Sequence, residues 1–208
     1  MKILLYLGCC VALLTMSSCQ SDKMVEEELP SGLIKQYSVD PESGEKTGKF
    51  LLVKPDGTVL EESRYENGEL EGERVLYNTE GKKERVEQYE SGKLKGIYKG
   101  FYPSGGLQFE GEYRENEMSG LWTYYYASGE VKEKVHYEHN FENGPFEEYY
   151  PDGTIKAKGN YLVGDNEDGL LFLYDESGDP ERVMECDSGI CRTQWTPDST
   201  EIDFDEVY

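Results

Sequence analysis

The chain has 208 residues, with 43 acidic and 21 basic side chains and a formal net charge of −22 at pH 7. Nucleic acid is excluded as an expected partner, because phosphate binding needs clustered lysine and arginine. Two interpretations of the charge stay open: solubility at a crowded surface, or attraction of a cationic partner or calcium.

The first 18 residues carry one charge, Lys2, followed by an apolar run from Ile3 to Met16. This run is shorter than the roughly 20 residues that a membrane-spanning helix needs, so it predicts a signal peptide. The run ends in Met16-Ser17-Ser18-Cys19, which resembles the lipobox of bacterial lipoproteins. The resemblance implies that Cys19 is acylated and becomes the new N-terminus. The alternative is an ordinary secretory signal with an incidental cysteine.

Residues 19–36 follow the predicted cleavage point and begin with a polar, acidic stretch that has no hydrophobic pattern. We expect this segment to be a lipidated N-terminus and solvated tether. Together, the signal and the anchor predict a bacterial envelope protein, held by lipid at the outer membrane and facing the periplasm or the surface. Removing Lys2 with the signal gives the mature chain a net charge of about −23.

Tyrosines recur every 24 residues through the middle of the chain, and two columns of glycines share this interval. The tyrosines are Tyr65, Tyr89, Tyr113, Tyr137 and Tyr161. A sixth copy fits if one residue is inserted after Tyr161, which brings Cys186 into the tyrosine column. These columns predict a tandem-repeat domain of about six copies over residues 37–186.

Each copy contains two predicted strands. The first starts at a column glycine and is rich in aromatic residues, as in residues 120–126. The second alternates, with Val131, Glu133, Val135 and Tyr137 on one face and lysines and His136 on the other. Asn67-Gly68 and the equivalent pairs in later copies, which include Glu115-Asn116 and His139-Asn140, fit tight turns. The expected fold is all-β, an elongated, twisted antiparallel β-meander of about a dozen strands built from 24-residue hairpin repeats.

The aromatic residues of the first strands support two interpretations. They could form a platform that stacks a glycan or peptide, with the candidate residues Tyr98, Trp122, Tyr124 and Phe146 and with Trp122 and Tyr124 at its centre. They could also pack across strands as the core of the repeat, because a single sheet has no second layer to bury it. We favour packing, and keep the four residues as the candidate binding surface.

After the repeats, residues 187–208 form an acidic segment that we expect to be a C-terminal cap or tail. Cys186 and Cys191 lie close in sequence, and in an exported protein this favours a short disulfide over a redox or metal site. The histidines, His136 and His139, do not fit a metal site. The sequence shows no catalytic motif, so we expect no enzyme activity, no cofactor and no metal.

The repeat pattern from Tyr113 to Tyr161 resembles the MORN repeat variant, and in particular the YwqK-like bacterial proteins named as antitoxins of toxin–antitoxin systems. The resemblance implies an antiparallel β-meander used for interactions, without shared catalytic residues. The main hypothesis is therefore a membrane-anchored module that binds a protein or an envelope component. The alternative is an antitoxin or immunity-like protein that neutralises a toxin.

Overall fold

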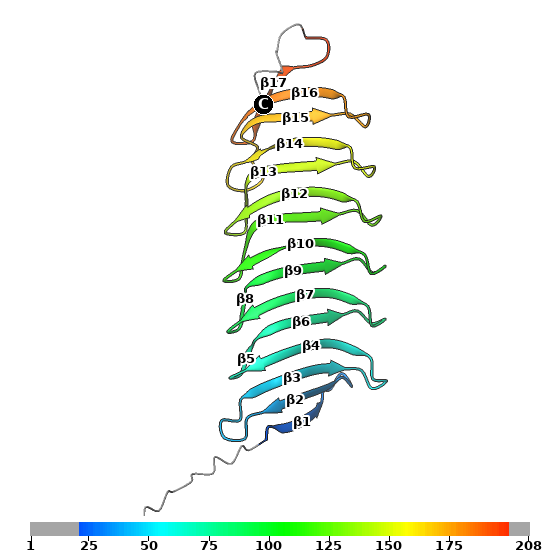
Figure 1. Cartoon of the computed structure of the whole chain (residues 1–208), viewed down its shortest axis with the longest axis vertical. Coiled ribbons are helices and arrows are strands. Elements are labelled where there is room, and N and C mark those ends of the chain that lie inside the picture. Colours follow the sequence, from blue (N-terminus) through cyan, green and yellow to red (C-terminus); the bar gives the residue numbers. More distant parts are fainter. Residues whose placement is uncertain (1–20, 200–208) are drawn as a thin grey trace, which may run out of the picture.

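The computed structural model describes residues 21–199, so the predicted signal segment and Cys19 lie outside the described residues. The described chain is all-β, with 17 strands in one open antiparallel sheet (Figure 1). The strands add to the sheet antiparallel and in chain order, which confirms the predicted β-meander. Within residues 21–199 no helix is long and apolar enough to cross a membrane.

The strands have the following bounds. They are β1 Lys23–Glu28, β2 Ile34–Val39, β3 Lys46–Val53, β4 Val59–Glu66, β5 Glu69–Leu70, β6 Gly72–Tyr77, β7 Lys83–Glu90, β8 Lys93–Leu94, β9 Gly96–Phe101, β10 Leu107–Arg114, β11 Glu117–Tyr125, β12 Val131–Glu138, β13 Phe141–Tyr149, β14 Ile155–Tyr161, β15 Gly169–Tyr174, β16 Pro180–Asp187 and β17 Ile190–Trp195. The short strand β5 and the following β6 both pair with β4, and β8 and β9 both pair with β7. Each of these two pairs therefore acts as one interrupted strand.

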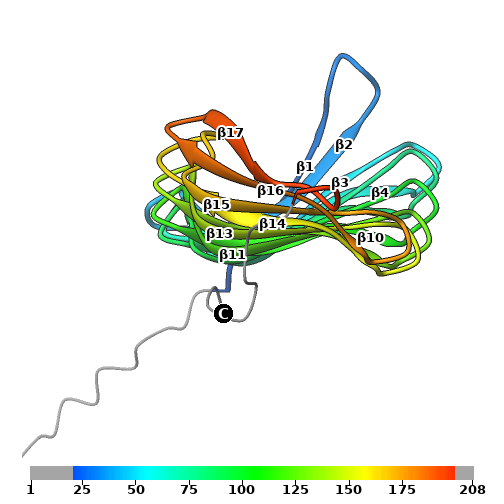
Figure 2. The same ribbon diagram turned by 90° about the horizontal axis from the view of Figure 1, so that it is seen from above.

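The sheet is long in the direction in which strands are added and only one strand length wide (Figure 1). Seen end-on, the strands are bent into a shallow crescent, with successive copies stacked over one another (Figure 2). Sheets of many strands must twist or curve in this way. The stacking places equivalent residues of successive copies in columns along the sheet.

Tight turns with positive φ at both central residues join one copy to the next. Asn67 and Gly68 have φ of 51° and 81°, and Glu115 and Asn116 have 51° and 69°. These angles identify type I′ turns, whose twist matches that of the flanking strands. The prediction of left-handed geometry at these positions is confirmed.

Hydrogen bonds also join each turn to the preceding copy, along the side of the sheet where the strands end. Asn140 Oδ1 accepts a hydrogen bond from the backbone N–H of Met118 at 2.8 Å, and Asn116 does the same for Leu94. On the other edge, Tyr126 donates from its hydroxyl to the carbonyl of Tyr149 at 2.7 Å. Equivalent tyrosine bonds run from Tyr102 to Tyr125 and from Tyr150 to Tyr174. Each copy is therefore fastened to its neighbours at both edges.

The two ends of the sheet differ from the sequence expectation. Residues 23–28, expected to be a solvated tether, form β1 and pair in register with β2 from Lys23↔Val39 to Glu28↔Ile34. The backbone hydrogen bonds of this hairpin do not require an apolar pattern, which explains why no strand was predicted there. At the other end β17 extends the sheet to Trp195, and the total of 17 strands exceeds the dozen expected.

Candidate interaction site on the tyrosine face

The five column tyrosines share one face of the sheet, which we call the tyrosine face. Four of the five rings, those of Tyr65, Tyr113, Tyr137 and Tyr161, contact aromatic residues of the first strands. Trp122 lies edge-on to Tyr113 and Tyr137, with centroids 5.5 and 5.9 Å away. Phe146 stacks on Tyr161 at 4.2 Å. In the middle and C-terminal copies the side chains of this face thus form the hydrophobic layer that a single sheet otherwise lacks.

Buried residues in the middle and C-terminal copies form what we call the aromatic centre of this face. Trp122 is 2% exposed, Phe146 is 3% exposed and Val135 is fully buried. The full set is Trp122, Val135, Phe146, Ala157, Leu171 and Cys186. Two of the four candidate binding residues, Trp122 and Phe146, therefore pack as core, in agreement with the interpretation that the sequence favoured.

Three strand glycines explain how such large rings fit on the sheet. A Cβ atom added at Gly111 would lie 2.2 Å from the Trp122 ring, and one at Gly100 would lie 2.2 Å from the Phe109 ring. At Gly159 it would lie 2.9 Å from Phe146. Each ring therefore lies flat on the backbone of the neighbouring strand, in the manner of aromatic residues that cover strand glycines.

A hollow of about 240 Å³ opens on the tyrosine face above Trp122. Tyr98 and Tyr124, the other two candidate residues, line it and are only partly buried. The complete lining is Tyr98, Phe109, Tyr113, Met118, Trp122 and Tyr124. The indole N–H of Trp122 is buried and has no hydrogen-bond acceptor among the described residues. Trp122 thus forms the floor of the hollow, and Tyr98 and Tyr124 can contact a bound group.

One copy in the N-terminal half carries polar residues, Arg74, Glu61 and Glu87, at the equivalent positions, and we call this group the charged centre. One copy earlier the position of Arg74 is held by Phe50, which is buried. Arg74 donates from Nε and Nη2 to the two carboxylate oxygens of Glu61, at 2.9 and 3.1 Å, and from Nη1 to Glu87 at 3.2 Å. Tyr89 donates its hydroxyl hydrogen to Glu87 at 3.0 Å. Burial lowers the pKa of Arg74, but the bonds to Glu61 outweigh this effect and the pKa is raised.

Three glutamates lie on the tyrosine face beside the hollow. Glu133 is paired across the strands with Tyr124 on one side and with Glu148 on the other. Glu142 accepts a hydrogen bond from Tyr137 at 3.0 Å, and the hydroxyl of Tyr137 lies 3.3 Å from that of Tyr124. Burial raises the pKa of Glu133, and the charges of Glu148 and Glu142 raise it further. The carboxylates therefore repel one another at a partly buried position.

The opposite face is covered mainly by ion pairs, with exposed apolar side chains among them. Lys99 and Glu110 lie 2.9 Å apart, and Lys49 and Glu62 lie 2.7 Å apart. Leu121 is 48% exposed there and pairs across the strands with His136. His139, in a turn, contacts Glu117. Within residues 21–199 no three histidine, cysteine or acidic side chains are grouped as metal ligands.

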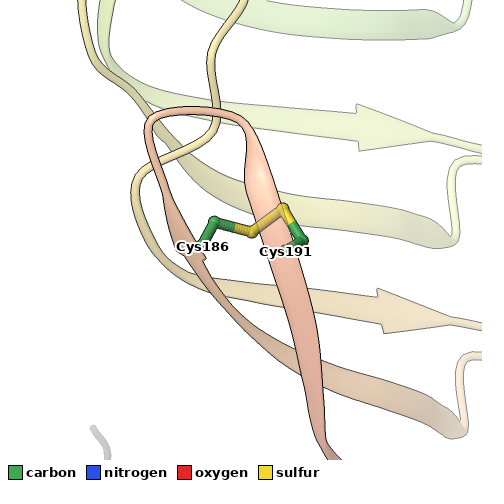
Figure 3. The surroundings of a disulfide bond; sticks show 2 residues. All are labelled: Cys186 and Cys191. Carbon is green, nitrogen blue, oxygen red and sulfur yellow. A yellow bond between two sulfur atoms is a disulfide. The ribbon is translucent and has the colours of Figure 1, made fainter.

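The last hairpin carries a disulfide between Cys186 and Cys191 (Figure 3). The two residues are directly opposed in β16 and β17, with Cα atoms 4.0 Å apart. Cys186 is 4% exposed and takes the place of the column tyrosine in the sixth copy. The bond thus joins the terminal strand to the end of the aromatic centre.

Sequence comparison assigns three successive segments to the MORN repeat variant family: residues 94–115, 118–139 and 142–162. No curated protein sequence matches the chain. The matched segments contain the whole lining of the hollow as well as Glu133 and Glu142. The tandem matches indicate a repeat-based binding module, and they coincide with the aromatic part of the tyrosine face.

Three residues of the predicted binding surface, Tyr98, Trp122 and Tyr124, line the hollow, and Phe146 does not. The carboxylates beside the hollow were not among the predicted site residues. A usable signal exists four residues before each column tyrosine. That column reads Glu61, Arg85, Phe109, Glu133 and Ala157. Glu133 is a charged residue in a part of this face where the neighbouring copies have Phe109 and Ala157, so the column marks it as a candidate polar site.

Proposed function

We propose that this protein is a membrane-anchored, extracytoplasmic lipoprotein whose MORN-like sheet binds a partner protein or envelope component through the tyrosine face. The observation that carries the proposal is the hollow above Trp122, which combines a fixed aromatic floor with partly exposed tyrosines. Aromatic side chains on a rigid support are typical anchors of protein interfaces. Repeat sheets also present extended surfaces suited to binding.

The size of the hollow favours a side chain of a larger partner over a free small molecule. At about 240 Å³ it is smaller than the roughly 300–1,000 Å³ of small-molecule sites. Its residues come from β9, β10 and β11, so one partner side chain would contact three adjacent strands.

The disulfide supports the proposed location outside the cytoplasm. Disulfides persist in oxidising compartments and are rare in reducing ones. The pair lies in an unbroken hairpin at the end of the sheet and closes the buried layer, which fits a structural role. The predicted signal peptide and Cys19 point in the same direction.

A site-specific photo-crosslinking experiment in whole envelopes tests the proposal. Benzoylphenylalanine replaces Met118 on the rim of the hollow, and the matched control carries it at Leu121, three residues away on the opposite face. We expect one dominant adduct from position 118 and none from position 121. Equal labelling at both positions, or none at either, would contradict binding through the tyrosine face.

The anchor is tested with a Cys19→Ala variant of the same crosslinking strain. We expect the variant to lose labelling by radioactive palmitate and to lose the position-118 adduct, because the module leaves its membrane. Unchanged palmitate labelling would contradict lipidation at Cys19. An adduct with a secreted toxin would make neutralisation the specific form of the interaction.

A further inference from the structure

Glu61 and Glu133 occupy the same position of the repeat, four residues before a column tyrosine and three copies apart. Both lie on the tyrosine face. Glu61 is on β4, which pairs with β6, and Glu133 is on β12, which pairs with β13. The structure therefore contains two versions of one carboxylate site, and their partners can be compared directly.

At Glu61 the neighbouring strand β6 supplies Arg74, whose guanidinium binds both carboxylate oxygens at 2.9 and 3.1 Å. This paired geometry is the strongest form of carboxylate recognition by a side chain. The residue equivalent to Arg74 beside Glu133 is Phe146, on β13. The copy that contains Glu133 thus keeps the carboxylate but lacks the internal arginine.

No other described residue takes the place of that arginine. Within residues 21–199, no hydrogen bond or ion pair reaches the Glu133 carboxylate; the nearest charges that stabilise it act at longer range, from Lys132 and Lys156. Lys156 is already bonded to Glu148 at 2.7 Å. The carboxylates of Glu142 and Glu148 act on the same space, and of these only Glu148 is paired with a cation among the described residues, so the space around Glu133 carries a net negative charge.

The aromatic hollow adjoins this carboxylate through Tyr124. Tyr124 lines the hollow and is also the cross-strand partner of Glu133, so their side chains stand next to each other on one face. A planar cation bound between these two residues would stack on the ring of Tyr124 and form hydrogen bonds with the carboxylate of Glu133. Guanidinium groups are suited to this combination of stacking and paired hydrogen bonds. Arg85, on the side of the hollow that Tyr98 lines, donates a hydrogen bond to the Tyr98 hydroxyl at 3.3 Å.

We propose that Glu133 and Tyr124 bind an arginine side chain of the partner protein, which supplies the guanidinium that Arg74 supplies to Glu61. The proposal rests on the proposed function and names the chemistry of its partner. Charge complementarity supports the same choice, because a chain of net charge −22 attracts basic segments. Glu142 and Glu148 strengthen the attraction, and the hollow holds the apolar neighbour of the arginine.

A peptide titration of the full-length protein, purified in detergent, tests the arginine site. The probe is acetyl-Gly-Leu-Arg-Leu-Gly-amide, and its control replaces arginine with the uncharged isostere citrulline. The readout is the ¹⁵N indole signal of Trp122, which a Trp195→Phe variant separates from the other tryptophan of the chain. We expect a saturable shift with the arginine peptide and about tenfold weaker binding of the citrulline peptide.

Two variants localise the effect. Glu133→Gln should weaken binding of the arginine peptide about tenfold, because it removes the central charge at nearly constant shape. Glu62→Gln, which removes a carboxylate from the opposite face, should leave binding unchanged. Equal binding of the citrulline peptide, or equal losses in both variants, would overturn the site, since general attraction to an acidic protein would then suffice.

The crosslinking experiment separates this inference from the proposed function. An adduct from position 118 that persists undiminished in Glu133→Gln would overturn the arginine site while the interaction role stands. Arginine-selective peptide binding without any adduct in envelopes would support the site and contradict the role.

Discussion

The tyrosine face contains two centres built on the same backbone. In one copy of the N-terminal half its middle row holds Arg74 between Glu61 and Glu87, and in the later copies it holds Trp122, Val135 and Phe146. Arg74 and Trp122 are equivalent residues, two repeats apart. The comparison shows that the fold of a copy does not depend on what fills its centre. It depends on the turns and on the tyrosine column, which both regions share.

This division of roles explains how the sheet can carry a local site. The edges of each copy are fixed by positive-φ turns and by bonds from one copy to the next. The side chains at the centre of a copy can therefore differ: they form ion pairs around Arg74, packed rings around Trp122, and an unpaired carboxylate at Glu133. Changes in the centre should therefore alter stability by different amounts in the two regions without abolishing the meander.

The largest effect should come from the aromatic centre. Replacing Trp122 with Ala removes five ring contacts and leaves Gly111 uncovered. We expect a loss of about 3–5 kcal/mol in the free energy of unfolding, as for other large-to-small core changes. Urea denaturation followed by far-ultraviolet circular dichroism measures it. Trp122→Phe, which keeps a ring over Gly111, should lose clearly less; an equal loss would contradict the covering role.

Removing Arg74 from the charged centre should lower the free energy of unfolding by less than Trp122→Ala does. Arg74→Ala leaves Glu87, whose side chain is 5% exposed, without its closest cation. We expect a loss of about 2 kcal/mol, because this largely buried carboxylate then keeps only the more distant Arg85, 3.9 Å away, and the Tyr89 hydroxyl as partners, while Arg74 itself is partly solvated. The same urea series measures the loss, with the exposed Arg64→Ala as a control that should change stability little. A loss as large as that of Trp122→Ala would mean that the two centres contribute equally.

Gly111, on the strand beside Trp122, allows a second comparison of the two centres. It is equivalent to Glu87, so one position holds a carboxylate in the charged centre and a bare backbone under Trp122 in the aromatic centre. Gly111→Ala should destabilise the protein by about 1–3 kcal/mol, because the added methyl group displaces the indole ring. Thermal unfolding measures the change. Gly111→Ala combined with Trp122→Ala should lose less than the sum of the two single changes; full additivity would contradict direct contact.

The repeat and its turns could be predicted from the sequence because they rest on short-range rules. The 24-residue columns and residues such as Asn67 and Gly68 define the hairpins without reference to distant contacts. The strand β1 could not be predicted, since its acidic residues show no apolar alternation. They are held by the backbone of β2 and by polar side chains on it, Gln36 for Glu26 and Lys35 for Glu27. The unpaired state of Glu133 was also hidden, because it depends on comparing cross-strand neighbours, and these are known only once the register is fixed.

The smallest expected effect concerns Glu133, and its sign is opposite to that of the other changes. Its pKa in the folded protein is raised above the ordinary glutamate value of 4.5, through burial and the charges of Glu148 and Glu142. The folded state therefore holds this proton up to a higher pH than the unfolded state. It follows that the group lowers stability as the pH rises from about 4.5 through the raised pKa.

Glu133→Gln removes this penalty. We expect the variant and the parent to be equally stable below the ordinary glutamate pKa, and the variant to be more stable by about 0.5 kcal/mol at neutral pH. Urea midpoints measured from pH 4 to pH 8 check the prediction. Glu61→Gln provides the matched comparison, because it loses its bonds to Arg74 and should be less stable than the parent at neutral pH. Equal signs for the two variants would show that Glu133 is already neutralised within the folded protein, and no charge would then remain there for a partner's arginine to meet.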